Sequence, residues 1–131
     1  MRPPALIASA VLLAALAGCG STDDTSGTLS PNAIASIEAE SGFPPKPDSE
    51  TQARSITALN SIDGEIVTGK EMAVDWARSL CSVVKDRPND QAKLVDLTNK
   101  RFRAPGHLDG FGKAKATKIL AAVRKYICPT Y

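Results

Sequence analysis

The sequence has few of the residues that build large cores and metal centres. Its 131 residues include one Trp, three Phe, two Tyr and a single histidine, His107. Because aromatic side chains bury the largest areas, a core with so few of them must depend on aliphatic packing. One imidazole and scattered carboxylates do not supply the ligand set of a metal site. We therefore expect one small domain with no metal and no other cofactor.

The sequence also lacks an apolar run long enough for a membrane span. The longest run, Ala5 to Ala17, is broken only by Ser9 and has about thirteen residues, whereas a spanning helix needs roughly twenty. Arg2 precedes this run, and small residues follow it. This order is typical of a signal peptide, so residues 1–18 are predicted to direct export and to be removed.

The end of this segment, Leu16-Ala17-Gly18-Cys19, resembles the bacterial lipobox, in which the cysteine thiol receives a diacylglyceryl group before cleavage. An ordinary secretory signal with an incidental cysteine is the alternative. Two acyl chains hold a protein on a membrane much more firmly than one. We expect Cys19 to be the lipid-bearing N-terminus of a lipoprotein on the extracytoplasmic face of the cell membrane.

Residues 19–47 are expected to be a flexible, acidic and proline-rich tether. Residues 20–28 offer no apolar side chain to a core. Ser30-Pro31 is a helix-start signal, so a brief helix is possible there. Pro44, Pro45 and Pro47 then favour extended backbone. Residues 19–53 contain six acidic and one basic side chain (net −5), whereas 54–131 contain eight acidic and fourteen basic (net +6).

Apolar residues recur at helical steps over four segments of residues 48–131, and no useful stretch alternates with period two. The predicted helices cover about 49–60, 70–86, 90–102 and 112–128. Turn residues and prolines separate them, at Asp63-Gly64, Arg87-Pro88 and Ala104-Pro105-Gly106. The fold class is thus all-α, a small four-helix domain preceded by the disordered tether.

With Cys19 lipidated, Cys81 and Cys128 remain as an even pair in an exported chain. Extracytoplasmic thiols tend to be oxidised, so a structural disulfide is expected to staple the domain. The 46 intervening residues and the lack of neighbouring histidines argue against a metal site or a redox-active pair.

Several of these segments together resemble the actinobacterial domain of unknown function 732. The resemblance covers roughly residues 43–131 and rests on the segments Phe43-Pro44-Pro45-Lys46-Pro47-Asp48, Trp76-Ala77-Arg78-Ser79-Leu80-Cys81 and Tyr126-Ile127-Cys128-Pro129, with Ala53, Leu59, Gly64 and Val67. In many members of this family the cysteine directly follows the tyrosine, whereas in this chain Ile127 lies between Tyr126 and Cys128. The resemblance implies a small exported or lipid-anchored helical domain cross-linked by two cysteines, and it implies no activity.

Three patterns suggest catalysis or phosphate binding, and each is incomplete. Ser82-Val83-Val84-Lys85 matches Ser-x-x-Lys but lacks the other elements of penicillin-binding enzymes. The glycines from Gly106 to Gly112, followed by Lys113, have the wrong spacing for a phosphate loop, and the required Ser or Thr is absent. His107 has Asp109 nearby but no nucleophile beside it in sequence. We therefore expect no catalytic residues and a protein that is not an enzyme.

Basic residues are concentrated near the C-terminus. The candidates for binding an anionic surface are Lys100, Arg101, Arg103, Lys113, Lys115 and Lys118; Arg124 and Lys125 follow. Several such charges could hold the domain against phospholipid headgroups or acidic polymers. The alternative is an ordinary solvated helix surface with cations near a helix C-terminus.

These observations predict a lipid-anchored helical module that acts by binding a protein or an anionic polymer at the cell envelope. The first alternative is a carrier whose helices part to hold a lipid or another apolar ligand. The second is a small envelope hydrolase. Nucleic acid is not an expected partner outside the cytoplasm.

Overall fold

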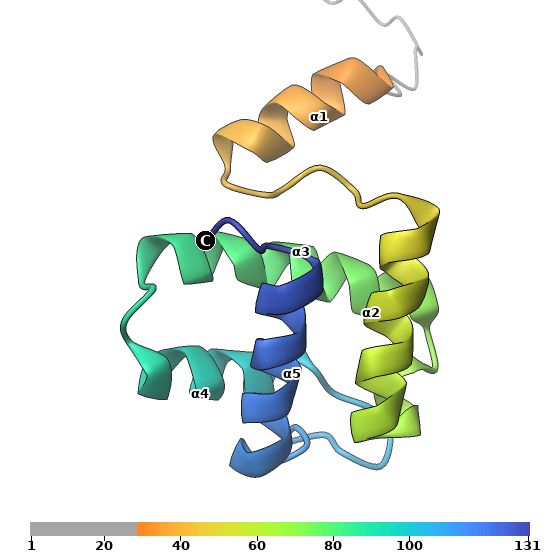
Figure 1. Cartoon of the computed structure of the whole chain (residues 1–131), viewed down its shortest axis with the longest axis vertical. Coiled ribbons are helices and arrows are strands. Elements are labelled where there is room, and N and C mark those ends of the chain that lie inside the picture. Colours follow the sequence, from red (N-terminus) through yellow and green to blue (C-terminus); the bar gives the residue numbers. More distant parts are fainter. Residues whose placement is uncertain (1–28) are drawn as a thin grey trace, which may run out of the picture.

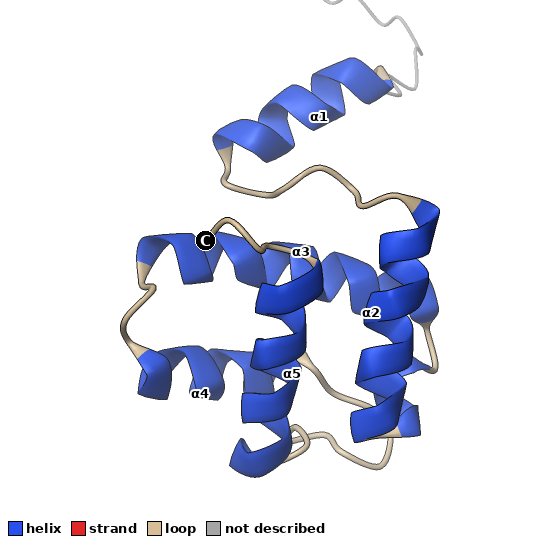
Figure 2. Ribbon diagram, viewed as in Figure 1, coloured by secondary structure: helices blue, strands red, loops and turns tan. Residues whose placement is uncertain are grey.

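The computed structural model describes residues 29–131 (Figure 1). The predicted signal peptide, Cys19 and the first part of the predicted tether lie outside the described residues. The elements are α1 (Pro31–Glu40), α2 (Ser49–Ile62), the 3₁₀ helix η1 (Gly64–Val67), α3 (Lys70–Asp86), α4 (Gln91–Arg101) and α5 (Lys113–Tyr126). Over this range the chain is mostly helical and has no strand, as Figure 2 shows, which confirms the predicted all-α class.

Local side chains explain where α2 and α4 begin. Asp48 caps α2, because its Oδ1 accepts a hydrogen bond from the Thr51 amide at 2.9 Å. Asp90 caps α4 in the same way, accepting from Lys93 at 3.1 Å. Such caps satisfy amides that have no partner within the helix. The predicted segments 49–60, 70–86 and 90–102 accordingly agree with the observed helices to within two residues.

The helices after residue 48 form a body around an aliphatic core. In Figure 1, α5 crosses in front of α3 and α4, whereas α2 crosses α3 alone, and α5 packs against all three of the other helices. The fully buried side chains include Leu59, Leu80, Leu94, Ile119 and Leu120. Among residues 29–131, the one aromatic side chain in this fully buried set is Phe102, so the expectation of aliphatic packing is confirmed.

A disulfide joins α3 to the end of the chain. Cys81 lies in α3 and Cys128 just after α5, with 5.8 Å between their Cα atoms. Both cysteines are buried within the core. The predicted Cys81–Cys128 pairing is thus confirmed.

The sequence predicted four helices, but the described residues 29–131 contain a fifth α-helix, α1, which precedes the body. Its start is locally encoded: Ser30 accepts a hydrogen bond from the Ala33 amide at 3.3 Å, and Pro31 occupies the first turn. Gly42, at φ +78°, lets the chain turn back toward α3. From residue 29 onward the predicted tether therefore contains a helix and a segment that contacts the body.

None of the helices within residues 29–131 combines the length and the apolarity that a membrane span requires.

Candidate functional site

The structure divides the predicted basic residues into two groups. Lys100 and Arg101 end α4, and Arg103 follows in the connection to α5. Lys113, Lys115 and Lys118 lie on the first half of α5.

The first group lines a surface hollow of about 410 Å³. Its lining residues are Trp76, Leu97, Lys100, Arg101 and Arg103, and we call it the Trp76 hollow. Trp76 is half-buried and meets Phe102 edge to face, with ring centroids 5.8 Å apart. The buried Phe102 ring therefore fixes the indole at the surface. No carboxylate from residues 29–131 lines this hollow.

The side chains of Lys100, Arg101 and Arg103 differ in the partners that they bind. Arg101 reaches across to α3, where its Nη1 donates to Ser79 Oγ at 2.5 Å. Lys100 Nζ pairs with Asp96 Oδ2 one turn earlier at 2.9 Å, and this hydrogen bond lowers the pKa of the Asp96 carboxyl. In the described part of the chain, Arg103 makes no hydrogen bond or ion pair through its side chain. Arg103 is thus the cation of this group that is most available to a ligand.

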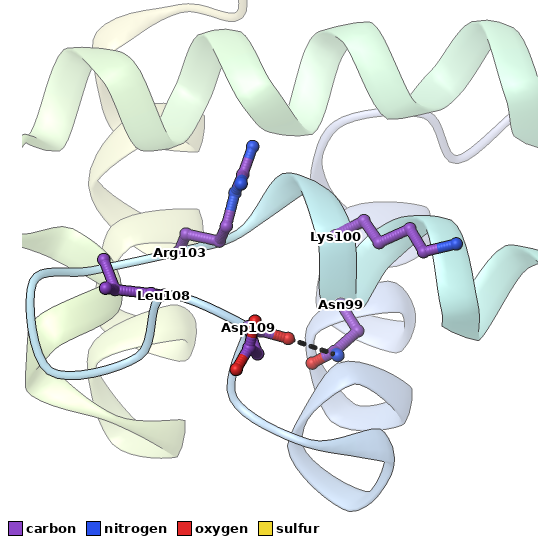
Figure 3. Close-up of a pocket in the computed structure, with 5 residues that line it drawn as sticks. All are labelled: Asn99, Lys100, Arg103, Leu108 and Asp109. Atoms are coloured by element: carbon purple, nitrogen blue, oxygen red, sulfur yellow. Dashed lines mark hydrogen bonds between the residues drawn. The ribbon is translucent and has the colours of Figure 1, made fainter.

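A neighbouring hollow of about 370 Å³ shares Lys100 and Arg103 and is completed by Asn99, Leu108 and Asp109 (Figure 3). In Figure 3 the Arg103 side chain extends toward α3, while Lys100 extends along α4 away from Leu108. Asn99 fixes the loop, since its Nδ2 donates to the Asp109 carbonyl at 2.9 Å.

A glycine is required where this loop passes Asn99. Gly110 has φ +92°, and a Cβ at this position would lie 2.2 Å from the Asn99 carbonyl oxygen. The loop can approach α4 this closely only because Gly110 has no side chain. The close approach of Gly110 to Asn99 thus positions one wall of the 370 Å³ hollow that Arg103 also lines.

The second group does not line the Trp76 hollow. Lys115 Nζ pairs with Asp63 Oδ2 at 2.7 Å, joining α5 to the turn after α2, and this hydrogen bond lowers the pKa of the Asp63 carboxyl. Lys113 is exposed and close enough to Asp96 to act on its carboxyl electrostatically. Lys118 is exposed on the outside of α5. The six candidate residues therefore do not form one continuous binding surface around the hollow.

The catalytic patterns in the sequence do not become catalytic arrangements. Ser82 Oγ donates to the Ser79 carbonyl of its own helix at 2.9 Å, and Lys85 lies 5.7 Å from the Tyr131 ring. His107 packs against Phe111 with ring centroids 4.3 Å apart. These side chains make structural contacts, and the geometry brings no nucleophile and base together among them.

The glycine-rich loop is engaged as well. The Gly112 amide, which precedes α5, donates to Asn99 Oδ1 at 2.8 Å. This amide is therefore already paired rather than directed at a phosphate. Within residues 29–131 no cluster of His, Cys, Asp and Glu is arranged to hold a metal ion.

Sequence reasoning missed the role of Arg78, which is buried in α3. Its Nε and Nη2 donate to the Pro44 carbonyl at 3.1 and 3.0 Å, and Nη2 also pairs with Glu38 Oε2 at 2.5 Å. The partners lie 34 and 40 residues away in sequence, so no local pattern indicates them. A lone arginine on an otherwise apolar helix stripe was the available signal.

Comparisons with protein-family models, with curated proteins and with solved structures found no match to this chain. The resemblance to the actinobacterial domain of unknown function 732 therefore stays a prediction.

Proposed function

We propose that this protein is a lipid-anchored, non-enzymatic binding module of the cell envelope, and that its Trp76 hollow receives an anionic partner. The observation that carries the proposal is the Trp76 hollow itself. Two guanidinium groups and an ammonium group line it together with an accessible indole, and no acidic side chain of the described residues lines it.

The chemistry of these groups favours an anion. Guanidinium groups bind carboxylates and phosphates through paired N–H donors, and an indole adds apolar contact next to them. Each cation near an anionic surface contributes about 1 kcal/mol of attraction. Arg103, which has no partner within residues 29–131, would make such bonds without first breaking another.

The proposed location rests on the N-terminal sequence pattern and is supported by the disulfide. Disulfides persist mainly outside the reducing cytoplasm. The buried Cys81–Cys128 bridge is thus compatible with an exported domain held by lipid at Cys19. The resemblance to domain of unknown function 732 points the same way.

The geometry favours a surface binder over a carrier of apolar ligands. A carrier needs an enclosed apolar chamber, typically of 300–1,000 Å³ for a small ligand. In the described part of the chain, Leu80, Leu120 and their neighbours fill the space between the helices, and the hollows open at the surface.

A binding measurement tests the role of the hollow. The full chain, held in phosphatidylcholine vesicles, is titrated with polyglutamate, and the double variant Arg101→Ala, Arg103→Ala is compared with the equally charged control Lys118→Ala, Lys125→Ala. We expect the first pair to weaken binding about tenfold or more and the control pair to weaken it far less. Added salt should weaken binding by the unaltered protein. Equal losses from both pairs would contradict a local site.

A second experiment tests the anchor. We expect Cys19→Ser to shift the protein from the membrane fraction to the soluble fraction. An unchanged membrane-bound, processed species would contradict the proposed lipidation.

A further inference from the structure

We infer that the partner is an acidic peptide segment with one large apolar side chain, bound across the Trp76 hollow and a second, apolar hollow beside it. This inference deepens the proposed function and rests on it. The second hollow has a volume of about 250 Å³, and its apolar lining comes from Ile66, Met72, Trp76, Ala104 and Pro105. We call it the Met72 hollow.

The two hollows are neighbours with a shared wall. Trp76 and Arg103 line both of them. One ligand can therefore contact the apolar side of Trp76 in the Met72 hollow and the cations in the Trp76 hollow. An occupant that uses both needs an apolar group and an anionic group a few ångströms apart.

The size of the Met72 hollow selects a side chain rather than a larger apolar ligand. Pockets for drug-sized molecules start at about 300 Å³, so a volume near 250 Å³ suits a single large side chain. Met72 is 53% exposed, and its flexible thioether can adjust to the inserted group. Gly69 adds no side chain to the wall and leaves room next to Met72.

The charges around the hollows orient the ligand. Lys100 and Arg101 line only the Trp76 hollow, Arg103 lines both hollows, and Glu65 lines only the Met72 hollow. Carboxylates of a ligand are attracted to the cations of the Trp76 hollow and repelled by Glu65 in the Met72 hollow. The apolar side chain should therefore enter the Met72 hollow, and the flanking Asp or Glu residues should lie toward Arg101 and Arg103.

Other anionic partners use only part of this arrangement. A uniform polyanion has no apolar group for the Met72 hollow. A lipid surface binds apolar side chains that project from the protein, so it would contact the exposed Met72 but not Ile66 and Ala104, which are recessed and buried. A peptide with both kinds of side chain uses all the groups that the two hollows present.

Trp76 provides the measurement, because it is the only tryptophan in the chain. The full chain is held in phosphatidylcholine vesicles, and Trp76 fluorescence is followed during titration with three probes. The probes are a short peptide with a leucine between aspartates, the same peptide with serine in place of leucine, and polyglutamate. We expect the leucine peptide to change the fluorescence and to bind about tenfold more tightly than the serine peptide, as burial of a large apolar side chain implies.

Variants on each side of the shared wall complete the test. Met72→Ser should remove the preference for the leucine peptide over the serine peptide. Arg103→Ala should lower the affinity for both peptides about tenfold. Lys118 is an exposed cation outside both hollows, so Lys118→Ala is the matched control. It should change neither the preference for leucine nor the affinity for the peptides. Met72 and Arg103 are exposed, so these changes leave the core intact.

Three results would overturn the inference. If polyglutamate and both peptides bind alike and lose affinity in Arg103→Ala, the proposed binding of anions stands and the peptide inference falls. If only phosphatidylglycerol vesicles, used in place of phosphatidylcholine, change the Trp76 signal, the partner is a membrane surface. If no probe binds, the inference falls together with the assigned role of the hollow.

Discussion

The N-terminal segment, residues 29–47, and the body, residues 48–131, are both helical but are stabilised in different ways. Helix α1 buries none of its side chains, and Leu29, Ile34 and Ile37 are exposed. The body buries an aliphatic core and closes it with a disulfide. Hydrogen bonds from Arg78 to the Pro44 carbonyl and an ion pair with Glu38 attach this segment to the body. Local sequence can therefore specify a helix, but buried apolar area and covalent linkage are what make the body stable.

The largest expected effect comes from opening the disulfide. The double variant Cys81→Ala, Cys128→Ala should lower the free energy of unfolding by about 4 kcal/mol, because the unfolded chain regains the entropy of a long closed loop. Equilibrium denaturation of the oxidised protein and the variant measures this difference. A loss below about 1 kcal/mol would show that the core alone holds the body, since measured disulfide contributions are typically larger.

A matched pair of aliphatic truncations compares the two regions directly. Leu120→Ala removes a side chain that is 1% exposed in the body and should cost about 3 kcal/mol. Ile37→Ala removes one that is 53% exposed in α1 and should change stability by less than about 0.5 kcal/mol. Thermal denaturation of both variants tests the contrast. Equal losses would mean that α1 belongs to the core.

A smaller effect is expected at the junction between the regions. Glu38→Ala removes the ion pair to Arg78 and should speed hydrogen exchange in α1, with a cost to the body of about 1 kcal/mol or less. Glu40→Ala, an exposed acid on the same helix, is the control and should leave α1 exchange unchanged. Equal rates of hydrogen exchange in α1 for both variants would show that the Glu38–Arg78 ion pair does not hold α1 to the body.

The smallest effect concerns pH and the bond between α5 and the turn after α2. The hydrogen bond from Lys115, and next the Glu65 amide, lower the pKa of Asp63 in the folded state. The resulting stabilisation is present above the unfolded-state pKa, about 3.9, and is lost as pH falls through the lower folded-state value. Asp63→Asn should therefore flatten the fall in Tm at acidic pH. An unchanged pH profile would mean that this pair contributes little to stability.

The sequence predicted the helices of the body because their signals are local. Asp48 and Asp90 cap α2 and α4, and Pro88 follows the end of α3. The disulfide was also predictable, because two cysteines allow only one pairing once Cys19 is set aside. The position of α1 was not predictable, since it depends on Arg78, whose partners lie far away in sequence.

The candidate site was predictable only in part. The sequence identified Lys100, Arg101 and Arg103 as a basic group, but it also included Lys115, which pairs with Asp63. It did not place Trp76 beside these cations. That contact depends on how α3 packs on α4, and the spacing of apolar residues along one helix does not encode it.

We propose that a helical body, closed by a disulfide, is held outside the cytoplasm by a lipid. Mass spectrometry of the protein isolated from membranes without reduction tests it most directly. We expect a mature chain that begins at a diacylglycerylated Cys19 and contains Cys81 linked to Cys128. A chain with an unmodified Cys19, or with free thiols at Cys81 and Cys128, would contradict it.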